Sequence, residues 1–161
     1  MQVKRVCDEH ARLLDDLGRY RRLVGRFIYL TITRPELCYA VHILSQFMQE
    51  PKDEHFEAAR RVLRYLKGTS RYGILLQSNC DLQIHAYCNA NWSACPLTRQ
   101  SITAYLVTLG DSPISWKTKK KTTISRSSAE FEYHSMAATT SELMWLKALL
   151  ACLRIFHKSP M

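Results

Sequence analysis

The sequence lacks a long apolar run. A membrane-spanning helix needs about 18 or more consecutive, mostly apolar residues, and the best candidate, around 27–32, is bounded by Thr33 and interrupted by Thr31. Residues 1–12 are charged and carry no apolar core, so no secretory signal is visible. We therefore expect an intracellular protein without a membrane partner, in a compartment that the sequence does not specify.

Glycine, proline and closely paired cysteines are also scarce. Five Gly and five Pro in 161 residues, with 47% hydrophobic and 23% charged residues, exclude a collagen-like, mucin-like or disordered chain. The length suits one ordinary domain or two small ones. The six cysteines form no Cys-x-x-Cys pair, and the spacing of Cys88 and Cys95 is too wide for a usual zinc site. We expect reduced thiols, with disulfide or metal use as the alternative.

Negative charge is in deficit. The chain has 23 Lys and Arg against 14 Asp and Glu, a formal net charge of +9. Residues 1–77 hold 14 basic and 9 acidic side chains, and residues 78–161 hold 9 and 5, so neither half is a basic tail. The excess favours a polyanionic partner such as nucleic acid, and a solvated basic surface is the alternative.

The first half of the chain shows three helical patterns. Apolar residues spaced by three and four predict helices over 17–33, from Pro35 to about residue 48, and from Asp53 as N-cap to Gly68. The polar face of the third helix holds Arg60, Arg61, Arg64 and Lys67. Such a face is typical of a helix that follows a phosphate backbone or of a solvated surface.

After Tyr72 the apolar period changes from near 3.6 to 2. This pattern predicts a short strand at 73–76 and longer strands at 82–89, 102–109 and 114–117, and the three longer strands can form an antiparallel meander. The last strand is followed by a run of basic residues: Lys117, Lys119, Lys120 and Lys121. These lysines could follow a phosphate backbone or discourage strand addition at a sheet edge.

A long final helix is expected after residue 126. Its N-cap is either Ser127, with Glu130 completing a capping box, or Ser128, and it ends near Arg154. Its predicted buried stripe is Met136, Thr140, Leu143, Leu146 and Leu150.

Together these elements predict an α+β fold, with a helical segment followed by an incomplete mixed sheet of three antiparallel strands and one long helix. One helix on such a sheet leaves an open edge and a half-covered face. The apolar side chains of that helix therefore cannot all be buried: Met136, Leu143, Met144, Leu146, Leu149 and Leu150. We expect aggregation, self-association through the sheet edge, or a fold that depends on a partner.

Several stretches of the sequence resemble those of a known protein family. They lie at 20–25, 29–35, 44–48, 62–69, 114–119 and 125–130, and a Tyr-Cys-Asn-Ala-Asn-Trp motif lies at 87–92. In content and in order they resemble the Pol polyprotein of copia-type retrotransposons. The resemblance implies a charged segment at 1–19, the helical thumb or connection at the end of reverse transcriptase at 20–69, and a truncated RNase H domain at 72–161. The polymerase palm would lie upstream.

The resemblance also implies a catalytic site with departures from the family. In the family the strand motif is Tyr-Cys-Asp-Ala-Asp-Trp, its first Asp is a catalytic carboxylate, and a Glu in Ala-Glu-x-Glu-Tyr is the second. Asn89 and Asn91 occupy the two acidic positions here, and Glu132 fits the second role, with Glu130 as runner-up. A third family Asp would follow beyond residue 161.

These departures predict loss of the reaction. The family cleaves the RNA strand of an RNA–DNA hybrid with two Mg²⁺ ions, whose mutual repulsion must be offset by several carboxylates. Asn offers a neutral oxygen of similar shape, so we expect no functional metal site, no cofactor and no enzymatic activity. For Glu132 the alternative role is that of a first-turn acid favoured by the helix dipole, and neither His85 nor His134 has a ligand-spaced partner.

Three functions follow from the sequence. The first is a degenerate, inactive fragment of the polyprotein, derived from reverse transcriptase and RNase H. The second is a non-catalytic module that binds RNA–DNA hybrid or other nucleic acid through the basic residues of the third helix and the lysine run. The third is an active RNase H completed by a partner chain, and Asn89 argues against it, because a partner would not replace the first-strand acid.

Overall fold

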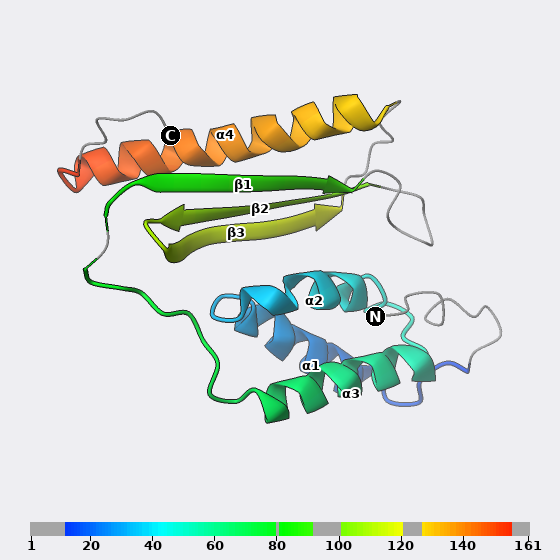
Figure 1. Ribbon diagram of the computed structural model, residues 1–161. Helices are drawn as coiled ribbons and strands as arrows, with labels where there is room; N and C mark the ends of the chain where they lie inside the picture. Colours follow the sequence, from blue (N-terminus) through cyan, green and yellow to red (C-terminus); the bar gives the residue numbers. More distant parts are fainter. Residues whose placement is uncertain (1–11, 80, 92–100, 121–126, 156–161) are drawn as a thin grey trace. The chain divides into compact units, whose positions relative to one another are not determined.

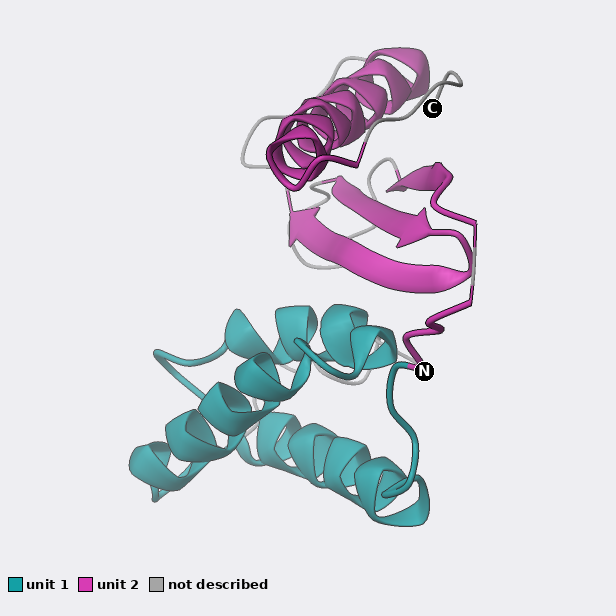
Figure 2. Cartoon of the chain, turned by 90° about the vertical axis from the view of Figure 1, so that its left-hand side faces the viewer, with its two compact units in different colours: residues 1–74 teal, residues 75–161 magenta. Residues whose placement is uncertain are grey.

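The computed structural model describes residues 12–79, 81–91, 101–120 and 127–155. It divides into two compact units, unit 1 over residues 1–74 and unit 2 over residues 75–161 (Figures 1 and 2). The described part of unit 1 contains helices, and unit 2 contains a three-stranded antiparallel sheet packed against one long helix. The predicted α+β class is thus confirmed. Within the described ranges, no helix is both long and apolar enough to cross a membrane.

Unit 1 consists of α1 (Leu17–Leu30), the short 3₁₀ helix η2 (Pro35–Leu37), α2 (Cys38–Ser45) and α3 (Asp53–Gly68). Their apolar faces meet in one core, formed by Tyr20, Val24, Phe27, Leu37, Val41, Leu44, Ala58, Ala59 and Val62. The Tyr20 hydroxyl donates a hydrogen bond to the Leu44 carbonyl at 2.8 Å, and burial raises the pKa of Tyr20.

The first helix ends three residues before the predicted position. After Leu30 the chain turns, and the hydroxyls of Thr31 and Thr33 donate to the carbonyls of Ile28 and Leu30. Pro35 explains the early end, because a residue before proline is pushed out of the helical region, and Arg34 has φ −133° and ψ 75°.

The third helix begins one residue earlier than predicted, and its N-cap is Lys52 rather than Asp53. The Lys52 N–H donates to Nδ1 of His55 at 2.9 Å, and the buried His55 ring stacks on Phe47 with the ring centres 3.7 Å apart. Asp53 and Glu54 lie in the first turn, where the helix dipole favours acidic side chains. A histidine therefore performs the capping role that the sequence pattern gave to an aspartate.

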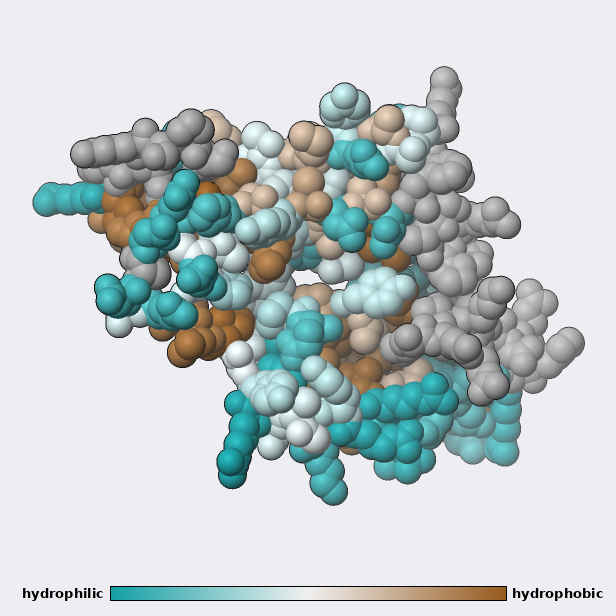
Figure 3. Space-filling model, viewed as in Figure 1, coloured by the Kyte–Doolittle hydropathy of each residue, from teal (hydrophilic) through white to brown (hydrophobic). Residues whose placement is uncertain are grey.

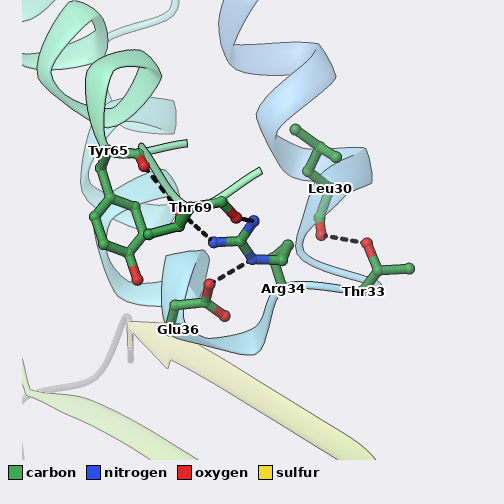
Figure 4. A network of polar contacts seen from close by, with 6 residues as sticks. All are labelled: Leu30, Thr33, Arg34, Glu36, Tyr65 and Thr69. Carbon is green, nitrogen blue, oxygen red and sulfur yellow. Dashed lines mark hydrogen bonds and ion pairs between the residues drawn. The ribbon is translucent and has the colours of Figure 1, made fainter. Parts of the chain in front are cut away.

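A buried arginine ties the turn after α1 to the end of α3 (Figure 4). The Arg34 guanidinium donates to the Thr69 carbonyl at 3.0 Å and to the Thr69 hydroxyl at 2.8 Å, and it forms an ion pair with Glu36. It also lies 5.9 Å from the centre of the Tyr65 ring. The Glu36 hydrogen bond raises the pKa of Arg34, so this side chain is a structural cation. Its role is not visible in the apolar pattern.

Unit 2 contains β1 (Ile84–Asn91), β2 (Ile102–Leu109) and β3 (Ser112–Lys120), paired antiparallel in that order, followed by α4 (Ser128–Cys152). Ile84 lies opposite Leu109, and a register irregularity separates Val107 from Thr108 where β2 pairs with β3. The meander of three strands is therefore confirmed. The short strand predicted at 73–76 is wrong: these residues have no regular secondary structure. A strand needs a hydrogen-bonded neighbour, and Leu75 and Leu76 are mostly exposed.

One face of α4 packs on the sheet, chiefly along β1 (Figure 1). Ser127 is its N-cap and accepts from the Glu130 N–H, which decides between the two predicted caps. The buried residues of α4 are Phe131, Ser135, Thr139, Leu146 and Leu150.

The predicted buried stripe of α4 is thus partly wrong. Leu146 and Leu150 are buried, but Met136 and Thr140 are exposed, and their neighbours Ser135 and Thr139 face the sheet. Apolar residues occur on all sides of α4, so their spacing does not identify the buried face. The small Ser135 lets the helix approach β1 closely, and its hydroxyl donates to the Asn89 carbonyl at 3.2 Å. The helix ends at Cys152 rather than near Arg154, which has a positive φ of 63°.

Candidate functional site

The two asparagines of the 87–92 motif lie on β1. Asn89 pairs with Ala104 and Asn91 with Ile102, and both asparagines are exposed. Alternate residues of a strand point to opposite faces. Ile84 and Ala86 pack with Leu146 and Leu150 of α4. Asn89 and Asn91 therefore lie on the sheet face that is opposite to α4.

The two candidate glutamates lie in the first turns of α4. Glu132 is exposed and precedes Ser135 by about one helical turn. Because Ser135 contacts Asn89, Glu132 lies at the same end of unit 2 as the asparagines. Glu130 faces His134, with Oε1 and Nε2 3.7 Å apart. Figure 1 shows the end of β1 beside the start of α4. The backbones of two motifs that are some 40 residues apart in the sequence thus meet at one end of unit 2, while the asparagine side chains lie on the sheet face away from α4.

The residues at this position do not fit a pair of magnesium ions. Asn89 and Asn91 offer neutral carbonyl oxygens, and Glu132 offers one carboxylate. Two divalent cations held close together need several anionic oxygens. Across the described ranges, no group of three or more His, Cys, Asp or Glu side chains could hold a metal ion. The arrangement can accept and donate hydrogen bonds, but its donor set does not suit two-metal hydrolysis.

The four predicted basic residues of α3 are all exposed: Arg60, Arg61, Arg64 and Lys67. In Figure 3, strongly hydrophilic side chains gather over α3 at the lower edge of the view. Glu57 forms ion pairs with Arg60 at 3.5 Å and with Arg64 at 2.7 Å. One carboxylate therefore offsets part of the positive charge on this face.

A set of arginines on α1 was not among the predicted binding residues. A groove between α1 and α3 is lined by Arg19, Arg22, Leu23, Arg26, Phe56, Arg60 and Leu63. The Arg19 guanidinium lies over the Phe56 ring, 5.1 Å from its centre. The spacing of Arg19, Arg22 and Arg26 by three and four residues places them on one helical stripe. That spacing is visible in the sequence, but the contribution of α3 to the same groove is not.

The lysine run of β3 is divided between two faces. The Ser115 hydroxyl donates to Glu142 of α4 at 2.7 Å, so Ser115 lies on the α4 side of β3. Lys117 and Lys119 follow it by two and four residues and therefore lie on the same face. There they line a pocket with Tyr105, Ser141 and Glu142, among others, and burial raises the pKa of Tyr105. Lys120 lies on the opposite face, and Lys121 is outside the described residues. The run is therefore not one continuous basic edge.

The chain is similar to several known proteins, among them two retrotransposon polyproteins and an effector protein. The retrovirus-related Pol polyproteins from transposons RE2 and RE1 of Arabidopsis thaliana are 48% and 46% identical over 147 residues, which is 91% of this chain and 10% of each polyprotein. The secreted RxLR effector protein 161 of Plasmopara viticola is 38% identical over 128 residues, 79% of this chain and 90% of that protein. No family model and no solved structure matches the chain. The chain spans about one tenth of the length of the two polyproteins.

Proposed function

This chain belongs to the Pol polyproteins of copia-type retrotransposons, being homologous to one segment of them, and on that premise we propose that it is a non-catalytic segment of such a polyprotein. Unit 1 corresponds in this proposal to the helical end of the reverse transcriptase region. Unit 2 corresponds to the first part of an RNase H domain. The order of three antiparallel strands and a long helix supports the second assignment.

The observation that carries the proposal is Asn89 at the end of β1, next to the first turns of α4. In an RNase H site this strand position supplies the first carboxylate, as the resemblance implies. Asn89 keeps the shape of an aspartate but removes its charge, and Asn91 does the same at the next acidic position. Glu132 remains as the single carboxylate in the two motif roles, and one carboxylate does not offset the charge of two Mg²⁺ ions.

Cleavage of a labelled RNA–DNA hybrid tests this proposal. The purified chain is incubated with a hybrid labelled on the 5′ end of its RNA strand, in Mg²⁺ and separately in Mn²⁺, with an active ribonuclease H as positive control. We expect no RNA fragment beyond the blank. Cleavage that persists in Glu130→Gln but disappears in Glu132→Gln would overturn the proposal, because it would trace the activity to this chain and not to a contaminating nuclease.

A second candidate function is binding of nucleic acid without chemistry, and the arginine-lined groove of unit 1 favours it. The formal net charge of +9 attracts polyanions at long range, and arginine suits phosphate contacts. A labelled RNA–DNA hybrid in fluorescence anisotropy tests it. We expect an affinity that falls linearly with salt on logarithmic axes. An affinity that does not change with salt would exclude a phosphate-dominated contact.

A further inference from the structure

We propose that the groove between α1 and α3, named here the arginine groove, binds the sugar–phosphate backbone of nucleic acid. The inference rests on the second candidate function above and assigns it to one site within unit 1. The site comprises Arg19, Arg22 and Arg26 of α1, Arg60 of α3 and an apolar floor of Leu23, Phe56 and Leu63. Three of these arginines lie outside the basic face that the sequence pattern indicates.

The geometry of α1 sets the three arginines in a row. The opposite stripe of this helix is buried through Tyr20, Val24 and Phe27, so the arginine stripe is held outward by the core. From Arg19 to Arg26 the helix advances about 10 Å at 1.5 Å per residue. One strand of a nucleic acid duplex carries a phosphate about every 3.4 Å along the axis. The row therefore spans about three phosphates.

The charge of the groove is one-sided. None of the described residues that line it is acidic. Two acids on the same helices have other partners: Asp16 accepts from the Arg19 N–H at the start of α1, and Glu57 pairs with Arg60 and Arg64. Four guanidinium groups around one concave surface concentrate positive potential there. A polyanion relieves their mutual repulsion when it enters.

The chemistry favours a phosphate backbone over other anionic surfaces. Arginine presents a planar fork of donors that matches phosphate oxygens in pairs. The apolar floor between the α1 row and Arg60 can pack against the sugars, while a flat lipid surface would not enter a groove between two helices. An acidic protein segment shares the charge but not the regular phosphate spacing. It is therefore an outcome of the test below.

Paired variants of the full chain test the site. The probe is a fluorescein-labelled RNA–DNA hybrid, and its anisotropy is followed over a range of salt concentrations. Arg22→Gln/Arg26→Gln removes two groove cations that take no part in the contact with Phe56. We expect binding at low salt to weaken by about 30-fold or more, and the slope of log affinity against log salt to flatten by about 2. Arg22→Lys/Arg26→Lys keeps the charge but loses the fork, so we expect an intermediate loss.

The matched control is Arg71→Gln/Lys147→Gln, which removes the same charge from two exposed positions outside the groove. We expect it to change binding by less than about threefold, since neither side chain lines the groove. Circular dichroism melts of all variants establish that each one is folded before its binding is compared.

The possible results distinguish a failure of the groove assignment from a failure of the nucleic-acid-binding function. If the wild-type chain binds the hybrid but the groove variant and the control lose affinity equally, net charge alone explains binding and the groove proposal is wrong. The same holds if Lys117→Gln/Lys119→Gln lowers affinity more than the groove variant. If the wild-type chain does not bind the hybrid at all, the nucleic-acid-binding function itself fails. If polyglutamate binds in its place and the groove variant abolishes that binding, the occupant is an acidic protein.

Discussion

The first helix of unit 1 and the helix of unit 2 differ in the residues that they expose outside their buried face. In α1 the side opposite Tyr20, Val24 and Phe27 carries arginines. In α4 large apolar residues lie outside the buried face, and Met136, Met144 and Trp145 are 53%, 61% and 58% exposed. A charged outer face suits water or a polyanion, whereas an apolar outer face is stable only when something covers it. The same chain thus presents two kinds of surface.

The largest expected loss of stability comes from a substitution in the core of unit 1. Phe27 is buried in the middle of α1, so Phe27→Ala should lower the free energy of unfolding by about 3–5 kcal/mol through lost contacts and a cavity. Urea unfolding followed by far-ultraviolet circular dichroism measures this, because the three tryptophans all lie in unit 2 and do not report on α1. Tyr29→Ala, at a position that is 76% exposed on the same helix, should change stability by less than about 0.5 kcal/mol.

The next largest loss of stability is expected when the buried cation of unit 1, Arg34, is replaced. Arg34→Ala loses two hydrogen bonds to Thr69 and leaves Glu36 without its ion-pair partner, at a cost of about 2–4 kcal/mol. Arg34→Lys should recover little of this, because a lysine cannot reproduce the planar fork. Thermal unfolding compares both with Arg61→Lys on the exposed side of α3. Equal melting temperatures for the two Arg34 variants and the wild-type chain would contradict the structural role of this arginine.

A smaller effect tests the close approach of α4 to β1 in unit 2. Ser135→Leu places a large side chain where the Ser135 hydroxyl contacts the Asn89 carbonyl, and overpacking of this kind costs about 1–3 kcal/mol. Ala137→Leu, on an exposed position of the same helix, is the control and should be near neutral. Tryptophan fluorescence during urea unfolding follows unit 2. If Ser135→Leu is no less stable than Ala137→Leu, the buried face of α4 has been assigned incorrectly.

A buried hydroxyl gives unit 1 a dependence on pH. The pKa of Tyr20 is raised by burial, so the unfolded chain releases this proton near pH 10 while the folded chain retains it. Stability contributed by this group is complete below about pH 10 and is lost as the pH rises further. Tyr20→Phe should reduce stability at neutral pH by about 1 kcal/mol, because the hydrogen bond to Leu44 is lost. It should also flatten the alkaline decline, which denaturant titrations between pH 8 and pH 11 measure.

The smallest effect on stability concerns the outer face of α4. Met136→Gln/Met144→Gln changes two exposed side chains, so the free energy of unfolding should shift by less than about 0.5 kcal/mol. Self-association should nevertheless decrease, because the apolar area open to a second molecule is smaller. Sedimentation velocity over a range of concentrations measures this. A wild-type chain that stays monomeric throughout would show that this face does not drive association.

The comparison of units also shows what could be predicted about the candidate site. The strand with Asn89 and the helix with Glu132 were both predicted, but their meeting at one end of unit 2 depends on the packing of Ser135 against β1. The basic face of α3 was predicted, whereas the arginine groove was not, since its two walls come from residues some 40 positions apart. A pattern in the sequence reports on one element at a time. A site that is shared by two elements needs their packing.

The sequence by itself determined the order of helices and strands, because the spacing of apolar residues and the positions of Pro35 and Gly68 act on the chain locally. It also determined that the side chain at position 89 is a neutral asparagine, since residue type alone decides it. Tertiary structure decided which face of α4 is buried, that His55 caps α3, and that residues 73–76 do not form a strand. The physical reason is the same in each case: burial, a cap and a strand ladder each require a partner from elsewhere in the chain.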